Sequence, residues 1–161
     1  MSSVMIKDVK VFSNPAPFNS PIEIEVTFEC VEELKEDLEW KLVYVGSSED
    51  DAQDQELDSI MVGPINVGTN QFTFSANPPN HESIPRDQLL DNSVIFLEGS
   101  YLNEKFVQVG YFINNEYTDP LLKENPPNPH EVDKIQRNIL ADQPRITTFP
   151  IDWSKGNNTQ Q

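Results

Sequence analysis

Apolar and polar residues alternate without a break over residues 22–30, which read Ile-Glu-Ile-Glu-Val-Thr-Phe-Glu-Cys. This is the period of an antiparallel strand that buries one face and leaves the other in water. Turn signals such as Asn14-Pro15, Gly63-Pro64 and Asn114-Asn115 separate this segment from others with the same period. Those further segments are 9–11, 40–44, 72–74, 94–101, 106–113 and 146–153. The pattern predicts an all-β fold: an immunoglobulin-like antiparallel β-sandwich with a few short helices in the loops.

Two of the segments, 94–101 and 106–113, are close enough to form a hairpin with residues 102–105 as its loop. Helical signals are scarce. Residues 84–91 fit a short helical turn, and residues 131–141 carry apolar side chains at helical spacing, namely Val132, Ile135, Ile139 and Leu140. No linker divides the chain, so we expect one domain over 1–154 and a polar, frayed tail over 155–161.

The predicted hairpin is apolar on both faces, which is unusual for a sandwich. Ile95 and Leu97 lie on one face of the first strand, and Val94 and Phe96 lie on the other. In the second strand, alternation separates Val107, Val109, Tyr111 and Ile113 from Phe106, Gln108, Gly110 and Phe112. One face of such a sheet should be wet. Either loops of the same chain cover the second face, or it presents an apolar patch to a partner.

The net charge of the chain limits the classes of partner that it can bind. Eleven basic against 27 acidic residues give a net charge of −16, and the acidic residues are concentrated between Glu29 and Asp58. We therefore expect no direct contact with nucleic acid and none with an anionic membrane, because both would be repelled. A cationic protein would be attracted and its association accelerated. The single cysteine, Cys30, excludes a disulfide framework and is expected to be a small buried side chain.

Candidate catalytic chemistry is sparse. The two histidines, His81 and His130, fall in loops rich in Pro and Asn and have no cysteine nearby. Neither a phosphate-binding glycine loop nor a Gly-x-Ser-x-Gly elbow occurs. We therefore expect no enzymatic activity, no catalytic residue, no metal and no cofactor. One alternative stays open: the acidic segment 47–58 could bind calcium, which would make the chain a calcium- or ligand-binding β-sandwich interaction module, although it lacks the order of a hand-type calcium loop.

Four long strings resemble the anti-silencing-function histone chaperones: FECVEELKEDLEWKLVYVGS at 28–47, DQELDSIMVGP at 54–64, VQVGYFINNEY at 107–117 and QRNILADQPRITTF at 136–149. The likeness runs in register from about residue 4 to Trp153. It implies an elongated immunoglobulin-like sandwich without enzymatic activity. It further implies a nuclear monomer that binds a histone H3–H4 dimer and exchanges it with other chaperones during nucleosome assembly and disassembly.

The resemblance also implies three binding sites. The surface for histone H3 would comprise Val94, Phe96, Gln108 and Phe112, with Asp54 and Glu49 facing basic histone residues. The surface for the C-terminal tail of H4, added as a strand, would comprise Leu140, Pro144, Arg145, Ile146, Thr147 and Tyr111. A groove for basic peptide segments of partner chaperones would comprise Phe28, Glu36, Asp37, Leu38, Met61 and Val62. Pro150, in the same predicted strand as Ile146, is tolerable only at a sheet edge.

The chain departs from the family pattern at the first of these sites. The family commonly has Arg at the position of Gln108, Tyr at Phe112 and Leu at Phe96. An amide can still hydrogen-bond an acidic histone side chain, but the charge-assisted bidentate contact of an arginine is lost. We therefore expect the histone surface to be differently tuned in this chain.

Overall fold

Two antiparallel sheets pack face to face in the computed structural model, which describes residues 3–45, 54–63, 65–84, 89–90, 93–127 and 130–154. The smaller sheet has the order β1 (Val4–Phe12), β3 (Ile22–Cys30) and β6 (Gly68–Ala76). The larger sheet has the order β2 (Ala16–Pro17), β9 (Ile135–Ile139), β8 (Glu104–Tyr117), β7 (Ser93–Tyr101), β4 (Leu38–Val45) and β5 (Asp54–Val62). A further strand, β10 (Arg145–Thr148), also pairs with β8.

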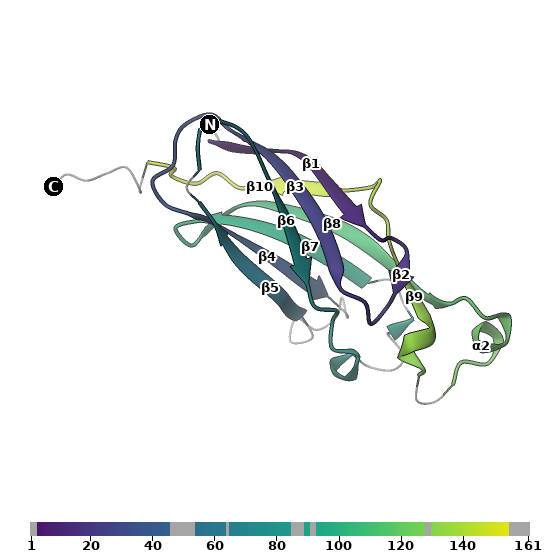
Figure 1. Ribbon diagram of the computed structural model, residues 1–161. Coiled ribbons are helices and arrows are strands. Elements are labelled where there is room, and N and C mark those ends of the chain that lie inside the picture. Colours follow the sequence, from purple (N-terminus) through teal and green to yellow (C-terminus); the bar gives the residue numbers. More distant parts are fainter. Residues whose placement is uncertain are drawn as a thin grey trace.

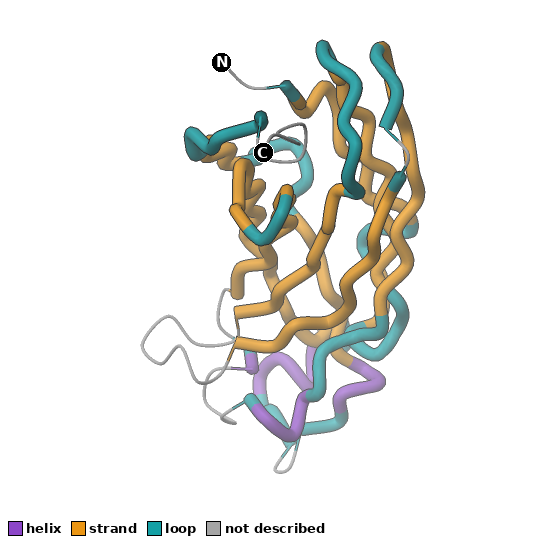
Figure 2. The backbone as a smooth tube through the Cα atoms, turned by 90° about the vertical axis from the view of Figure 1, so that its left-hand side faces the viewer, coloured by secondary structure: helices purple, strands orange, loops and turns teal. Residues whose placement is uncertain are grey.

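Helical segments are short and lie at one end of the sandwich. They are η2 (His81–Ser83), α2 (Pro120–Glu124) and η3 (Val132–Lys134). Figure 1 shows the elongated body that results, and Figure 2 shows the two layers of strands with the helical segments gathered at one end. The predicted immunoglobulin-like, all-β sandwich is confirmed. None of the helices in the described part of the chain is long and apolar enough to cross a membrane.

The core lies between the sheets and is built around Trp40 of β4. The Trp40 ring lies 5.8 Å from Phe28 of the smaller sheet and 5.8 Å from Phe106 of β8, centroid to centroid. The alternation predicted for residues 22–30 is observed, because every second side chain of β3 is buried. Burial of these large aromatic side chains, together with the aliphatic side chains of the core, stabilises the packing of the two sheets.

The predicted hairpin forms, but its loop is shorter than expected. Only Leu102 and Asn103 lie outside the strands, and both have positive φ values of 51° and 66°, as a two-residue primed turn requires. The register shifts between Gly99 and Ser100, so β8 carries one extra residue there. Phe106 was predicted to lie on the outer face of the sheet, and this prediction is wrong because of the bulge. Phe106 is buried, as is the next residue, Val107.

The helix predicted over residues 131–141 is wrong. A single turn of 3-10 helix ends at Lys134, and the chain continues as β9, which pairs with the end of β8. The buried positions of β9 are Ile135, Arg137 and Ile139. The middle inward position is the charged Arg137, so the sequence does not show a continuous apolar period of two. Ile135 and Ile139 alone are four positions apart, which fits the spacing of a helix.

Two further predictions about strands need correction. The last part of the acidic segment 47–58 belongs to a strand, β5, which pairs with β4 from Asp54 onward and has one irregularity in its register, between the partners of Leu42 and Val43. The strand predicted over 146–153 is shorter, because β10 ends at Thr148 and Pro150 therefore lies beyond it. Most of the helical turn predicted at 84–91 lies outside the described residues.

Candidate functional site

The outer face of the larger sheet carries a shallow apolar hollow of about 160 Å³. Cross-strand register creates it, because Val94 pairs with Phe112 and Phe96 pairs with Gly110 two rungs further along, on the same face of β7 and β8. The alternate positions Ile95 and Leu97 point into the core and are fully buried. The hollow is lined by Val94, Phe96, Gly110, Tyr111, Phe112 and Arg145. Of the two readings of this surplus apolar face, the described residues favour an open patch, since Phe112 is 38% exposed.

One edge of the apolar hollow is formed by a cation over an aromatic ring. The guanidinium carbon of Arg145, on β10, lies 5.2 Å from the centre of the Phe112 ring. Arg145 also pairs with Gly110 in the β10–β8 register, so it borders the hollow from the side opposite Phe96. Tyr111 is almost fully buried, and burial, with a smaller effect of the Asp8 charge, raises its pKa to about 12. Its phenol is therefore neutral at physiological pH.

The patch extends onto β4 through residues that sequence reasoning missed. Val43 pairs with Phe96 and Val45 with Val94, and both valines are half-buried on the same face. The alternation of residues 40–44 could have shown this, because Val43 occupies the outward position between two buried neighbours. The backbone of Asp54 pairs with Val45, which puts this acidic residue at the edge of the rung that contains Val94. Glu49 lies outside the described residues.

A polar cluster lies on the next rung after the apolar hollow. Glu98 pairs with Gln108 across β7 and β8. The ammonium of Lys105 donates a hydrogen bond to Gln108 Oε1 at 3.0 Å and lies 3.4 Å from Glu98 Oε2. It also lies 5.3 Å from the centre of the Phe149 ring. Lys105 was not among the residues that the sequence singled out, because the bulge in β8 that brings it to this face leaves no signal in the alternation.

The residues predicted to receive the H4 tail lie on and around β10. Arg145, Ile146 and Thr147 pair with Gly110, Val109 and Gln108 of β8. All four residues of β10 are exposed, and within the described chain no strand pairs with its other edge. Pro144 precedes the strand and is exposed, and Leu140 is half-buried and hydrogen-bonded to Phe112 through its backbone. Five of the six candidates are thus in one segment, while the Tyr111 side chain is buried beneath the apolar hollow.

A second concavity, of about 340 Å³, lies where β4 begins and the β7–β8 hairpin turns. This acidic groove is lined by Lys35, Glu36, Asp37, Glu39, Met61, Leu102 and Asn103. A Cβ at the neighbouring Gly63 would overlap the Asp37 carboxylate, so the glycine leaves room for this carboxylate in its present position. Met61, 60% exposed, provides an apolar surface among the charges. Glu36, Asp37 and Met61 are therefore together as predicted from the resemblance, and Val62 is half-buried on the neighbouring rung.

Two residues predicted for that groove are not on its surface. Phe28 and Leu38 are fully buried in the core. Phe28 packs against Trp40, and Leu38 pairs with Tyr101 in the sheet. Because both side chains are completely buried, they cannot contact a peptide without rearrangement of the core. The alternation of apolar and polar residues could not have predicted that Leu102 and Asn103 line the acidic groove, because the hairpin turn brings them there.

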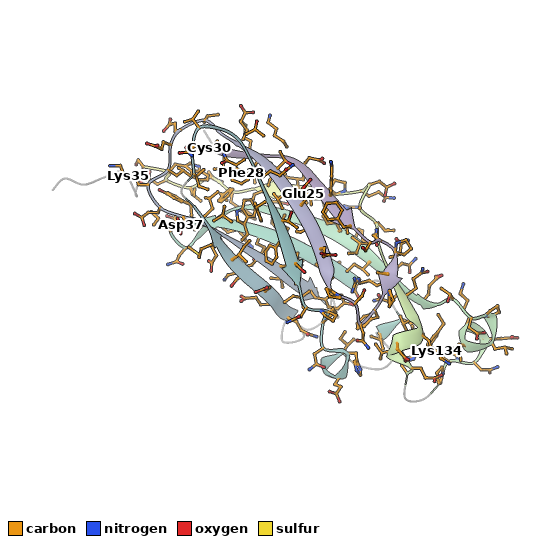
Figure 3. The ribbon with its side chains drawn as sticks, viewed as in Figure 1. Glu25, Phe28, Cys30, Lys35, Asp37 and Lys134 are labelled. Atoms are coloured by element: carbon orange, nitrogen blue, oxygen red, sulfur yellow. The ribbon has the colours of Figure 1, made fainter. Side chains whose placement is uncertain are left out.

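The apolar hollow and the acidic groove are separate. Val94 is near the start of β7, whereas Leu102 follows its end, and the intervening strand spans roughly 25 Å at about 3.3 Å per residue. Figure 3 shows Lys35 and Asp37 at one end of the sandwich, far from Lys134 at the opposite end. The apolar hollow and the acidic groove share none of their lining residues.

Other candidate chemistry is unsupported by the geometry. Burial is the main cause that raises the pKa of the Cys30 thiol, which disfavours the reactive thiolate. His130 Nδ1 lies 2.7 Å from the hydroxyl of Tyr117 and His81 starts η2. Over the described residues, no three Asp, Glu, His or Cys side chains cluster closely enough to hold a metal ion. The segment on which the calcium alternative depends is largely outside those residues, at 47–53.

Comparison with known proteins assigns a family to this fold. The family described as "ASF1 like histone chaperone" matches residues 1–154. The chain is 55% identical over 157 residues to "Histone chaperone ASF1" of Saccharomyces cerevisiae, covering 98% of this chain and 56% of that protein. It is 50% identical over 153 residues to "Probable histone chaperone ASF1A" of Arabidopsis thaliana, covering 95% of this chain and 78% of that protein.

A third relative is matched along its whole length. "Histone chaperone asf1" of Dictyostelium discoideum is 48% identical over 154 residues, which are 96% of this chain and 100% of that protein. The chain thus spans little more than half of the yeast relative and all of the Dictyostelium one. An in-register match of this extent, together with the antiparallel sandwich, assigns the family: the chain belongs to the ASF1-like histone chaperones.

Proposed function

We propose that this chain is a non-catalytic chaperone that binds a histone H3–H4 dimer and exchanges it with other chaperones during nucleosome assembly and disassembly. The observation that carries the proposal is the apolar hollow, an open apolar patch on the outer face of a sheet in a chain of net charge −16. Few monomeric proteins leave aromatic and valine side chains open on a sheet face without a partner. A basic, amphipathic helix complements both the patch and the surrounding charge.

Histone H3 would occupy the apolar hollow with the apolar side of its long C-terminal helix. Val94, Phe96 and Phe112 would provide the apolar contact, and Gln108 would hydrogen-bond at its edge. Asp54, at the edge of the same rungs, and Glu49 would attract basic histone residues. The apolar contact would supply most of the affinity, and the acidic residues would supply orientation and speed of association.

The C-terminal tail of H4 would extend the sheet at β10. The exposed strand residues Arg145 to Thr148 and the adjacent Pro144 offer backbone groups at an edge that a tail could pair with. Leu140 is hydrogen-bonded to Phe112 through its backbone, and Tyr111 lines the apolar hollow together with Arg145 of β10. Both would therefore support the added strand from below.

Basic segments of partner chaperones would bind in the acidic groove. Asp37 and Glu36 would pair with arginine or lysine, while Met61 and Val62 would contact the apolar part of the segment. Because Phe28 and Leu38 are buried, we assign them a supporting role only. Because the apolar hollow and the acidic groove share no lining residue, this arrangement would allow a partner to bind while histones are still held. The chain would act in the nucleus as a monomer.

The proposal is tested by titrating purified H3–H4 dimer into the chain and into its Val94→Arg variant at two salt concentrations. A charge in the apolar hollow should cost about 2–5 kcal/mol of binding free energy. Higher salt should weaken binding by the wild-type chain, because part of the attraction is electrostatic. Val67→Arg, the same substitution at an exposed valine outside both sites, is the matched control. Absence of histone binding, or equal affinities for the two variants, would overturn the proposal.

A further inference from the structure

The bulge in β8 puts two residues on one face that a regular strand would separate. Lys105 and Gln108 are three positions apart, so strict alternation would turn them to opposite faces of the sheet. The register shift between Gly99 and Ser100 and the burial of both intervening residues, Phe106 and Val107, remove this separation. Lys105 and Gln108 are therefore neighbours on the outer face, one rung away from the apolar hollow.

Three contacts hold the Lys105 ammonium in place. It donates to Gln108 Oε1 at 3.0 Å, it is 3.4 Å from the Glu98 carboxylate, and it is 5.3 Å from the centre of the Phe149 ring. The partners come from β7, from β8 and from the segment after β10. An ammonium held from three directions has little freedom to leave, although its side chain is 38% exposed.

These contacts fix which end of the Gln108 amide faces Lys105. An ammonium group can only donate hydrogen bonds, so the atom of the amide that contacts it must be the oxygen. The amide NH₂ is then turned away from Lys105. Gly110 and Phe96 of the apolar hollow occupy the next outward-facing rung on the side of Gln108 away from the hairpin turn, so an NH₂ turned away from Lys105 has the edge of the hollow within its reach. The contact with a cation also polarises the amide and strengthens its N–H donors.

We propose that Lys105 is a positioning residue, which holds the Gln108 amide as a hydrogen-bond donor at the edge of the apolar hollow and so selects a partner helix that presents a carboxylate there. This inference rests on the proposed histone-binding function and names a specificity determinant within its site. In a surface that otherwise attracts cations, a donor at this point fixes the register of the bound helix. Only a helix whose acidic residue meets Gln108 while its apolar side chains fill the hollow satisfies both contacts.

Because of Glu98, Lys105 has a second role: it neutralises a negative charge beside Gln108. Its carboxylate pairs in register with Gln108 and would repel an acidic partner residue if its charge were uncompensated. Lys105 neutralises it at 3.4 Å. Without the ammonium, the Gln108 amide could flip by about 180°, and the uncompensated Glu98 carboxylate would remain beside it. Both effects oppose a carboxylate and favour a neutral or basic residue at the same point.

The experiment compares wild type, Lys105→Met and Gln108→Glu. Methionine keeps much of the lysine's length over Phe149 without its charge. Glutamate is isosteric with glutamine and can still accept from Lys105, but it has no N–H donors. Lys123→Met is the control, because it also removes one charge and one ion pair, the one 3.4 Å long between Lys123 and Glu116, in α2 at one end of the sandwich. Each variant is titrated with H3–H4 dimers whose acidic residues on the long H3 helix are replaced one at a time by the matching amide.

We expect Lys105→Met and Gln108→Glu each to weaken binding of unmodified H3–H4 by about tenfold or more, and Lys123→Met to have little effect. One histone substitution should weaken the wild type strongly but leave the affinity of Lys105→Met nearly unchanged, which identifies the selected carboxylate. A purely structural role for Lys105 would instead lower all affinities equally. The inference is overturned if no histone substitution distinguishes Lys105→Met from wild type while Val94→Arg still abolishes binding. If wild type fails to bind H3–H4 at all, the proposed function itself fails.

Discussion

Gly110 lies opposite Phe96 in the β7–β8 register, and the ring of Phe96 occupies the space that a side chain on residue 110 would need. A Cβ at Gly110 would lie 2.9 Å from Phe96 Cε1. The aromatic ring thus covers the backbone of β8 and forms the wall of the apolar hollow. The depth of the hollow depends on the absence of a side chain at this point.

Gly110→Ala should therefore weaken histone binding more than folding. The ring of Phe96 is half-buried at the surface and can move into the hollow, so we expect a loss of binding of about 1–2 kcal/mol. Gly99→Ala is the control, since a Cβ there would lie 2.8 Å from Trp40 in the core. This second variant should lose about 1–3 kcal/mol of folding stability and keep the affinity of its folded fraction. Calorimetric titration and urea unfolding of both variants measure the two quantities, and the reverse pattern would refute the arrangement.

Asp37→Ala should separate the two sites. Loss of the carboxylate in the acidic groove should weaken a lysine- and arginine-rich peptide of a partner chaperone by about 1–3 kcal/mol and leave H3–H4 affinity unchanged. Gly63→Ala should act in the same direction, because its Cβ would displace the Asp37 carboxylate. Asp133→Ala, an exposed carboxylate at the other end of the sandwich, controls for net charge. Fluorescence titration measures both ligands, and joint loss of peptide and histone binding would show that the sites are coupled.

Arg137 should be essential for stability although it is remote from both sites. Its buried guanidinium donates to the carbonyls of Phe18 and Ser20 at 3.0 Å and of Pro21 at 3.3 Å. Arg137→Met would leave these acceptors without donors, so we expect a loss of about 2–4 kcal/mol in the free energy of unfolding. Arg137→Lys should recover only part, because an ammonium lacks the planar fork of donors. Arg145→Met, at an exposed arginine, should cost about 1 kcal/mol or less. Chemical denaturation checks this order.

The same arginine shows why some elements could be predicted from the sequence and others could not. The alternation of β3 is complete, so its bounds, 22–30, were predicted correctly. The alternation of β9 is hidden, since the middle inward position is Arg137 and not an apolar residue. β5 was overlooked for a related reason: it is an edge strand whose sequence is acidic, and its pairing with β4 is visible only in three dimensions.

The candidate site was predictable where it follows from alternation. The outward positions of Val94, Phe96 and Phe112 follow from a period of two, and these residues line one hollow. Phe106 was assigned to the wrong face because a bulge changes the period, and Lys105 was overlooked for the same reason. Phe28 and Leu38, carried over from the resemblance, are buried in the core.

Tyr111 should make stability depend on alkaline pH. Its pKa in the folded chain, about 12, is above the ordinary value of 10.0 for a tyrosine, mainly because of burial. The unfolded chain therefore loses the phenolic proton first as pH rises. The stabilising contribution is complete below pH 10 and is lost between pH 10 and 12. The free energy of unfolding should fall less steeply over this range for Tyr111→Phe than for wild type, as measured by urea unfolding at successive pH values. Identical slopes would contradict the assignment, because the other tyrosines and Arg137 contribute equally to both variants.

The free edge of β10 allows the sharpest test of strand addition. The amide of Phe149 donates to the carbonyl of Phe106, and hydrogen-bonded pairs recur at every second residue of an antiparallel ladder. It follows from the register that Thr147 and Arg145 bond to β8, whereas the backbone N–H of Ile146 faces the free edge. Ile146→Pro should therefore remove a donor that the H4 tail would use, at little cost to the fold, because proline is tolerated at an edge.

Thr147→Pro makes the opposite change at the neighbouring residue. It removes a hydrogen bond between β10 and β8, and it should loosen β10 and lower the melting temperature. Binding of an H4 C-terminal peptide should fall in both variants, but only Ile146→Pro should combine this loss with a wild-type melting curve and protected β8 amides in hydrogen exchange. Ile146→Ala, which keeps the N–H, measures how much of the peptide affinity comes from the exposed side chain. If Ile146→Pro binds the peptide as tightly as Ile146→Ala does, the tail does not pair with this edge, and the H4 contact must lie elsewhere on the chain.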